Sequence, residues 1–308
     1  MKYKHLFGPV PSRRLGLSLG IDLVPHKTCN LNCVYCECGN TTHLTNIRKE
    51  YVSVSEIISE LKDFLGKNTR VDFLTFSGAG EPLLNSGIGE IISFLKEFFP
   101  FYKLALLTNG ILLGNEAVCK EVKDIDLIIP SLDAGLEKTF KKINRPCKEV
   151  IFKEYINGLK NFSDSFSNEF WLEIFLLKGM NDTEYDLEKI KNISDVIKPD
   201  KIQLNTVDRP TAEKGVVGVS FEELVKIKEF FGANTEIIGK FNTKTEYNKD
   251  NIYLLLNCLE RRPLTVEDLR EATSLHINEL NKILSSLEAE GKLKRIQGDR
   301  GVFYKLLK

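Results

Sequence analysis

Short apolar stretches alternate with amphipathic stretches of helical period between about residues 17 and 239. The apolar stretches are rich in Val, Ile, Leu and Phe, which favours strands. They predict strands at residues 18–24, 71–77, 103–108, 127–131, 171–177, 201–205 and 235–238. Apolar residues three and four positions apart predict helices at residues 53–66, 88–98, 115–122, 149–161, 182–196 and 221–231. The first helix has the spacing of a capping box, with Ser53 at the N-cap and Glu56 three residues later.

This alternation of strands and helices indicates the fold class. Strands that alternate with helices favour a parallel sheet with right-handed crossovers and the helices outside. The chain carries no Gly-rich dinucleotide fingerprint, so a doubly wound sheet is the less suitable interpretation. We therefore predict an α/β fold, a partial (β/α)6 barrel of TIM type. In either fold, ligands bind at the carboxyl ends of the strands.

The pattern is different in the C-terminal part of the chain. Helical periodicity over residues 251–262 is interrupted at Pro263, and two further helices are predicted over residues 266–273 and 275–291. Two short strands around a Gly-Asp-Arg-Gly turn are predicted within residues 292–306. Helices followed by a β-hairpin in this order resemble a small winged helix-turn-helix.

The winged-helix interpretation sets the predicted domain boundaries. We expect a barrel domain at residues 1–245 and a winged-helix domain at residues 249–308, joined by a polar linker. Thr265 is placed to cap the second helix of the smaller domain. The third helix is predicted to bury an apolar face made of Leu280, Ile283, Leu284 and Leu287.

Composition narrows the class of protein. The chain has 43 basic and 43 acidic residues, so any nucleic acid or membrane would need a local patch. No apolar run is long enough to span a membrane, and the first residues lack the apolar segment of a signal peptide. We expect a cytoplasmic protein in a reducing compartment. Its 7 cysteines are clustered and odd in number, which favours a metal site over disulfides.

The stretch CNLNCVYCEC holds the cysteine cluster. Cys29, Cys33 and Cys36 have the spacing C-x3-C-x2-C, and Cys38 follows closely. A structural zinc site is one interpretation, and its fourth ligand would come from His26, Cys38 or His43. A redox dithiol of Cys33 and Cys36 is a second, because C-x2-C is the spacing of such motifs. Three thiolates on one loop also suit a [4Fe–4S] cube, each binding one iron and leaving the fourth iron open to a substrate.

The same stretch resembles the signature of the radical S-adenosylmethionine (SAM) superfamily. CNLNCVYC lies at the end of the first predicted barrel strand, and Tyr35 matches the aromatic residue before the last cysteine. The resemblance implies a [4Fe–4S] cluster on Cys29, Cys33 and Cys36, with SAM at the open iron. It further implies a one-electron donor such as flavodoxin or ferredoxin, and a 5′-deoxyadenosyl radical that takes hydrogen from a substrate.

A second segment supports the resemblance. SGAGEP follows the second predicted strand and is similar to the Gly-Gly-Glu segment that binds the methionyl ammonium of SAM in this superfamily. Gly78, Gly80 and Glu81 match it, while Ala79 occupies a glycine position. The alternative is an ordinary Gly-rich turn between strand and helix.

Residues at the ends of the third and fourth strands complete the implied SAM site. Asn109, Ser131 and Asp133 lie at positions where superfamily members bind the ribose hydroxyls and the methionyl carboxylate. The alternative is a turn-forming Asn-Gly and helix-capping Ser or Asp side chains.

Two further segments resemble one branch of the superfamily, the Fe–S oxidoreductases related to tRNA wybutosine (4-demethylwyosine) synthases. They are GPVPSRRLGLSLGIDLVPHKTCN at residues 8–30 and QLNTVDRP at residues 203–210. The candidates for substrate binding in them are Arg13, Arg14, Gln203, Asn205 and Arg209. Guanidinium groups suit phosphate and carboxylate, although surface salt bridges are the alternative. Wybutosine enzymes carry a second cluster on cysteines before the triplet, and this chain has none before Cys29.

The sequence is compatible with more than one class of substrate. An RNA, such as a tRNA, is one candidate, recruited by basic residues of the predicted wing, namely Lys292, Lys294, Arg295 and Arg300. A protein, a peptide or a small molecule is another. The rival class is an Fe–S sensor that regulates through a nucleic-acid-binding winged helix, for which the GAGE and SLD segments have no use.

Overall fold

The computed structural model describes residues 3–12, 14–67, 71–207, 211–238, 255–256, 259, 263–273, 275, 277–298 and 301–307. The chain divides into two compact units. One comprises Met1–Val10 and Ser18–Lys240, and the other comprises Pro11–Leu17 and Phe241–Lys308. Among the described helices, none combines the length and the apolar character needed to cross a lipid bilayer.

The larger unit is built on one sheet. Within the described residues it has eight strands in the order β1-β2-β5-β6-β7-β8-β9-β10. All neighbours from β2 to β10 pair in parallel. Their bounds are β1 Leu6–Ser12, β2 Gly16–Ile21, β5 Phe73–Phe76, β6 Lys103–Thr108, β7 Leu127–Pro130, β8 Glu169–Leu176, β9 Lys201–Thr206 and β10 Thr235–Ile237. The predicted strands are thereby confirmed.

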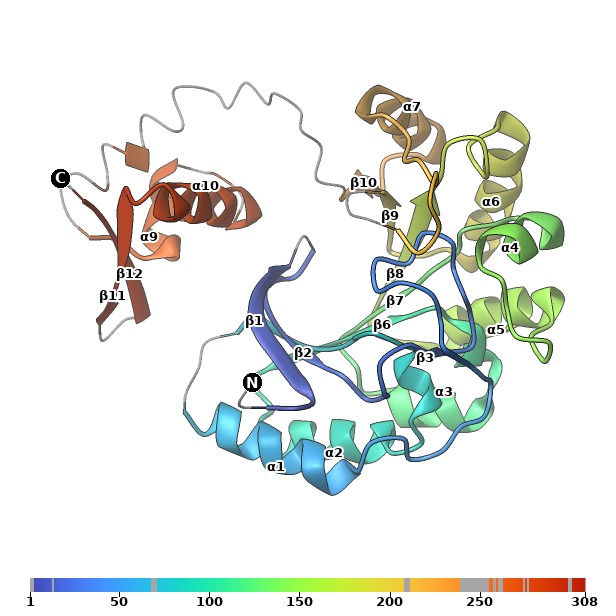
Figure 1. Cartoon of the computed structure of the whole chain (residues 1–308), viewed down its shortest axis with the longest axis horizontal. Helices are drawn as coiled ribbons and strands as arrows, with labels where there is room; N and C mark the ends of the chain where they lie inside the picture. Colours follow the sequence, from blue (N-terminus) through green and yellow to red (C-terminus); the bar gives the residue numbers. More distant parts are fainter. Residues whose placement is uncertain are drawn as a thin grey trace. The chain divides into compact units, whose positions relative to one another are not determined.

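Helices connect these strands and lie along the convex side of the curved sheet (Figure 1). The bounds are α1 Val54–Leu65, α2 Ile88–Phe98, α3 Glu116–Val122, α4 Glu137–Ile143, α5 Phe152–Ser165, α6 Glu184–Ile197 and α7 Phe221–Phe231. Two short 3-10 helices, η1 Pro82–Leu84 and η2 Ile111–Gly114, follow β5 and β6. The fold is the predicted α/β partial barrel.

The two faces of the sheet differ in polarity. Side chains on one face are apolar and fully buried, as at Leu19, Phe76 and Leu106. The other face carries polar side chains. Residues that pair in a parallel register point to the same face. Glu173, Gln203 and Glu236 are register partners across β8, β9 and β10 on this face. The helix-covered face forms the core, and the opposite face gives the barrel a polar interior.

One local expectation needs correction, and two elements of the structure were not predicted. Ser53 is the N-cap of α1 but makes no capping bond, because its hydroxyl bonds the Ser55 hydroxyl instead. The Glu50 carboxylate accepts from the first helical N–H, that of Val54, at 2.9 Å. The predicted capping box with Glu56 is therefore wrong. Strand β1 was not expected, since prolines interrupt its sequence; an edge strand tolerates them because one side needs no ladder bonds. Helix α4 was also not expected, being short and uncapped by a side chain.

The C-terminal unit has its own core. It contains α9 Val266–Thr273, α10 Ile277–Ala289 and an antiparallel hairpin of β11 Leu293–Gly298 and β12 Gly301–Leu306. Thr265 caps α9, accepting from the Asp268 N–H at 3.2 Å, as expected. The predicted apolar face of α10 is confirmed, with Leu280, Ile283 and Leu284 buried and Leu287 packed against them. Most of the helix predicted at residues 251–262 lies outside the described residues, although Leu255 and Leu259 belong to this core.

Candidate cofactor site

The cysteine loop follows β2 and is held at the carboxyl ends of the barrel strands. Its first cysteine ends β3 (Thr28–Cys29), which pairs with β4 (His43–Leu44). Backbone bonds anchor the loop to two other connections. Lys27 N–H donates to the Ala79 carbonyl at 2.7 Å, and Val34 N–H donates to the Ile143 carbonyl at 2.9 Å. The β2, β5 and β7 connections are therefore joined around the cysteines.

Every sulfur of the C-x3-C-x2-C triplet faces a nitrogen donor. The contacts are Lys27 Nζ to Cys36 Sγ at 3.0 Å, Asn144 Nδ2 to Cys33 Sγ at 3.5 Å and Asn109 Nδ2 to Cys29 Sγ at 3.6 Å. The Leu31 backbone N–H also points at Cys29 Sγ, at 3.4 Å. Donors in these positions stabilise negative charge on sulfur. The loop is thus prepared to hold thiolates.

The protonation of these thiols differs with their surroundings. Burial raises the pKa of Cys29 to about 12, and burial likewise raises the pKa of Cys33. A hydrogen bond with the Cys38 thiol, aided by the nearby Lys27 nitrogen, lowers the pKa of Cys36 to about 5. Cys38 itself is exposed. Metals bind thiolates, so loading this site with iron must release protons from Cys29 and Cys33.

The donor set fits an iron–sulfur cluster better than a single ion. Three soft sulfur ligands on one loop are the ligands that such a cube takes. A cube binds each thiolate at a separate iron, so the sulfurs need not converge on one point. Among the described residues, no three His, Cys, Asp or Glu side chains are arranged to share one metal ion. The zinc interpretation with His26, Cys38 or His43 therefore gains no support from the geometry.

Glu81 is buried beside the cysteine loop, with 2% of its surface exposed. Its Oε1 accepts from the Leu83 N–H at 3.0 Å and the Thr108 hydroxyl at 2.7 Å. Its Oε2 accepts from the Asn109 N–H at 2.8 Å. Burial raises the pKa of this carboxyl. An ionised carboxylate accepts about four hydrogen bonds, so Oε2 retains capacity for one more donor.

The glycines before Glu81 are required by close packing. Gly78 has a φ of 156°, and a Cβ there would lie 2.4 Å from the Asp22 carboxylate. A Cβ on Gly80 would lie 2.2 Å from the Thr28 carbonyl oxygen. Ala79 stands between them without a comparable requirement. The turn therefore needs glycine at both positions to approach the cysteine loop.

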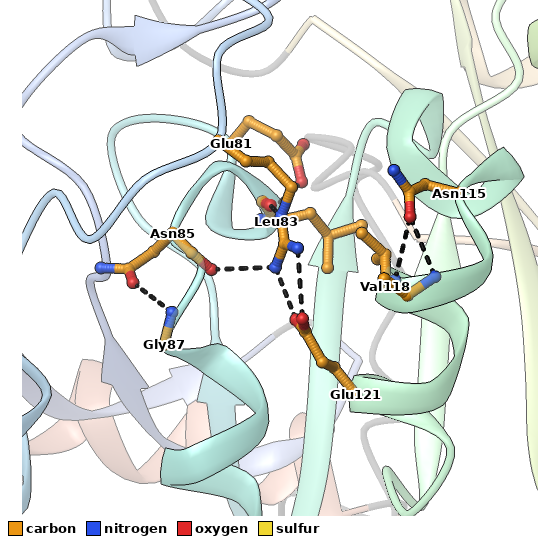
Figure 2. Close-up of polar contacts among 9 residues, drawn as sticks. Glu81, Leu83, Asn85, Gly87, Asn115, Val118 and Glu121 are labelled. Carbon is orange, nitrogen blue, oxygen red and sulfur yellow. Dashed lines mark hydrogen bonds and ion pairs between the residues drawn. The ribbon is translucent and has the colours of Figure 1, made fainter.

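A bridge of polar contacts braces the residues that follow Glu81 (Figure 2). Arg48 donates to the Leu83 carbonyl at 2.8 Å and forms an ion pair with Glu121 of α3 at 2.5 Å. Asn85 Oδ1 accepts from the Gly87 N–H at 2.8 Å, which fixes the start of α2. Because Arg48 follows the cysteine loop in the chain, this bridge ties that loop to the turn holding Glu81.

Asp133 follows β7 and joins the end of this strand to the cysteine loop. Its Oδ2 accepts from the Tyr35 hydroxyl at 2.5 Å and from Asn144 Nδ2 at 2.7 Å. Its Oδ1 accepts from the Phe175 N–H at 3.0 Å. Tyr35 also stacks on the Phe175 ring, with centroids 4.0 Å apart. Burial raises the pKa of Asp133 to about 6, although its hydrogen bonds oppose this. Ser131 lies two residues before Asp133 in the chain and pairs with Glu173 in an isolated parallel bridge.

The predicted substrate residues that the structure describes have partners other than the cysteines. Gln203 and Asn205 are buried on β9, where Gln203 Nε2 donates to Glu236 at 2.6 Å and Asn205 Nδ2 donates to Glu173 at 2.8 Å. They belong to the polar interior of the barrel. Arg14 lies in the turn between β1 and β2, where its N–H bonds the Ser12 hydroxyl. Arg13, Arg209 and Arg300 lie outside the described residues.

Sequence reasoning missed three residues of this site. Lys27 and Asn144 contact cysteine sulfurs, and Asn30 accepts from Asn109 Nδ2 at 2.5 Å. Asn30 lies within the cysteine stretch, and Lys27 is two residues before it, so proximity in sequence was an available signal. Asn144 is distant in sequence, and only the fold brings it to Cys33.

More than half of the chain matches the sequence model of a known family. A sequence model described as the Radical SAM superfamily matches residues 23–189. The chain belongs to the radical SAM superfamily. It is accordingly a radical SAM enzyme, whose cofactors are a [4Fe–4S] cluster and SAM.

Individual relatives are similar over nearly the whole chain. A UPF0026 protein of Methanocaldococcus jannaschii is 32% identical over 309 residues, covering 97% of this chain and 94% of that protein. A protein named GTPase Obg of Brachyspira hyodysenteriae is 39% identical over 303 residues, covering 96% of this chain but 44% of that protein. The chain therefore spans less than half the length of the second relative.

Solved structures resemble the fold. A radical SAM methyltransferase from Sphaerobacter thermophilus has a TM-score of 0.59 at 14% identity, over 74% of this chain and 67% of that one. A structure of TYW1 with a lysine–pyruvate adduct has a TM-score of 0.51 at 18% identity, over 71% of this chain and 74% of that one. At these identities the likeness shows the shared fold.

Proposed function

We propose that Cys29, Cys33 and Cys36 ligate the [4Fe–4S] cluster and that its open iron binds SAM. The observation that carries this proposal is the nitrogen donor facing each of the three sulfurs. When bound, the cluster and SAM supply reductive cleavage of a carbon–sulfur bond, which yields a 5′-deoxyadenosyl radical. The protein's part is to hold and orient these groups.

Residues at the strand ends are proposed to bind SAM. The remaining lone pair of Glu81 Oε2 is suited to the methionyl ammonium, because a carboxylate bond to a cation is strong when water is excluded. Gly78 and Gly80 let the backbone of this turn come close enough for that contact. Asn109, Ser131 and Asp133 lie at adjacent strand ends, and Tyr35 links Asp133 to the cysteine loop.

We propose that the substrate enters the polar interior of the barrel. Gln203 and Asn205 line this face with Glu173 and Glu236. Gln203 Oε1 is a buried acceptor with no hydrogen-bond partner among the described residues. An interior that is lined by protein side chains and excludes water protects a reactive radical from side reactions. With the cluster and SAM bound, the chemistry supplied there would be hydrogen abstraction from a substrate that these side chains hold.

The C-terminal unit is proposed to act as a winged helix that recruits RNA. Its hairpin carries Lys294, which is exposed, and Arg295, which pairs with Glu288 at 2.7 Å. Lys292 pairs with Glu290 at 2.6 Å. Exposed ion pairs of this kind contribute little to the stability of the fold, so phosphate oxygens can replace the carboxylates as partners of the basic groups. We further propose a cytoplasmic location, with reduction by a flavodoxin or ferredoxin.

Cleavage of SAM tests the proposed function. Protein purified without oxygen and reduced with dithionite is expected to convert SAM to 5′-deoxyadenosine, detected by mass spectrometry. The Cys33→Ala variant is expected to form none, whereas Cys38→Ala retains the activity. If reduced, iron-loaded wild type forms no 5′-deoxyadenosine even with cell extract as a source of substrate, the proposal is wrong.

A further inference from the structure

A basic segment lies directly behind the cysteine loop. Residues 137–149, from α4 into the following turn, carry five basic and two acidic residues, although the whole chain has no net charge. Backbone bonds join this segment to the loop between the ligands. Asn32 N–H donates to the Asn144 carbonyl at 2.9 Å, and Cys147 N–H donates to the Asn30 carbonyl at 2.9 Å. The surface of the basic segment is therefore next to the cluster site.

This surface has a hollow of about 630 Å³. Its lining includes Asn32, Leu44, Lys141, Arg145, Lys148 and Ile151. Leu44 and Ile151 are large apolar side chains with 44% and 54% of their surfaces exposed. Asn32 lies between two cysteine ligands in the sequence. One wall of the hollow is therefore the loop that holds the cluster.

The basic side chains around the hollow remain available to a partner. Lys141 pairs with Glu137 at 2.7 Å, but both side chains are more than half exposed. Lys148 is 91% exposed, and its nearest carboxylate, Glu149, is 3.9 Å away. Exposed ion pairs contribute little to stability in water, so these lysines can readily exchange their present carboxylate partners for those of another protein. Arg145 is more firmly held, at 2.6 Å from Glu213.

We propose that this hollow and its basic rim dock an acidic one-electron carrier protein that reduces the cluster. The inference rests on the proposed function, because it needs a cluster on Cys29, Cys33 and Cys36. One electron leaves the reduced flavin or iron–sulfur centre of the carrier and enters the oxidised cluster, and no atom is transferred. The carrier is left oxidised by one electron.

The composition of the surface favours a protein over a nucleic acid. Its lining combines exposed apolar side chains with basic ones, and protein interfaces likewise combine apolar and charged groups. A phosphate backbone offers nothing for Leu44 and Ile151 to contact. Electron carriers bind briefly through small interfaces, and opposite charges speed their association. A basic rim therefore suits a carrier with an acidic surface.

The test reverses charge at the rim and measures the reduction of the cluster. Iron-loaded Lys141→Glu/Lys148→Glu protein is mixed with reduced flavodoxin, and cluster bleaching is followed by stopped-flow absorbance at about 0.1 M ionic strength, where the Debye length is about 10 Å. The second-order rate constant is expected to fall at least about tenfold from wild type, and added salt is expected to narrow the difference. Reduction by dithionite, which needs no docking, is expected to stay unchanged.

A matched control separates location from charge. Lys120 pairs with Glu116 at 2.6 Å and Lys160 pairs with Asp164 at 2.8 Å, both as exposed pairs on α3 and α5. Lys120→Glu/Lys160→Glu makes the same change in net charge away from the residues that line the hollow. Its rate constant with flavodoxin is expected to stay within about twofold of wild type, because charges farther than a Debye length away are screened.

Each other result overturns the inference. Equal rate constants in the rim variant and wild type would place docking elsewhere, as would equal losses in the rim variant and the control. If the rim variant instead loses binding to bulk tRNA with unchanged reduction, the surface is a nucleic-acid contact. Bleaching is measured without SAM, so failure of SAM cleavage would refute the proposed function separately.

Discussion

Lys27 Nζ lies 3.0 Å from Cys36 Sγ, and only 4% of the lysine's surface is exposed. The lysine comes from the loop after β2, and its own backbone bonds the Ala79 carbonyl. A cation held against a cluster ligand stabilises the more negative, reduced state of the cluster. Because water screens little at a buried contact, this charge has a large effect.

The first prediction concerns the reduction potential. Lys27→Met removes the charge and keeps much of the volume, so the potential is expected to become more negative. We expect at least a tenfold fall in the equilibrium constant for reduction, which is about 59 mV for one electron. Lys27→Arg is the matched control and should keep most of the potential. The measurement is a redox titration followed by electron paramagnetic resonance, and equal potentials in wild type and Lys27→Met would contradict the account.

The second prediction concerns SAM affinity. Glu81→Gln keeps the shape of the side chain but removes the charge next to the proposed ammonium site. Loss of one charge-assisted bond is expected to weaken SAM binding by roughly 1.5–3 kcal/mol, measured by calorimetry on oxidised, cluster-loaded protein. Thr108→Val removes a neighbour of Oε1 and leaves the carboxylate, so its effect on SAM should be smaller. Unchanged affinity in Glu81→Gln would limit Glu81 to bracing the turn.

The third prediction concerns pH. The pKa of Asp133 is raised from 3.8 to about 6 in the folded protein, mainly by burial. Its protonated form therefore stabilises the fold fully below about pH 4, and this contribution is lost as the pH rises through 6. Between about pH 4.5 and 7, wild type should lose about 2 kcal/mol of unfolding free energy that Asp133→Asn does not lose. Urea denaturation of both proteins at several pH values measures this, and parallel pH profiles would contradict it.

The sequence predicted the regular parts of the fold because period and composition agree there. Helices α2 and α7 and strand β6 have the bounds expected from their apolar pattern. The departures have local causes. At Ser53, the hydroxyl bonds the Ser55 hydroxyl instead of the Glu56 N–H that the capping motif predicts. Strand β1 depends on its position at the sheet edge, which a local pattern does not report.

The site was predictable where a motif carries the chemistry. The cysteines, Glu81 and Asp133 lie at strand ends, where the order of strands already implies that they meet. Asn144 could not be inferred, because it reaches Cys33 from 111 residues away through the turn after α4. The partners of Gln203 and Asn205 were hidden for the same reason, since register sets which residues of β8 and β10 lie beside them.

The fourth prediction concerns RNA binding by the C-terminal unit. Phosphate contacts release counterions, so affinity of the full chain for bulk tRNA should fall steeply as salt rises. A variant with Lys292, Lys294, Arg295 and Arg300 changed to Gln should bind less tightly at low salt and depend less on salt. Filter binding at several salt concentrations measures both. Equal binding by the two proteins would exclude the wing as the RNA contact.

The cysteine assignment is the central claim, and one set of single variants tests it most directly. Cys29→Ala, Cys33→Ala, Cys36→Ala and Cys38→Ala are purified without oxygen, and iron and sulfide are measured in each beside wild type. The account predicts a full [4Fe–4S] complement in wild type and Cys38→Ala, and loss of the cluster in the other three. Loss of iron in Cys38→Ala with retention in Cys29→Ala would contradict it, and so would stoichiometric zinc without iron in wild type.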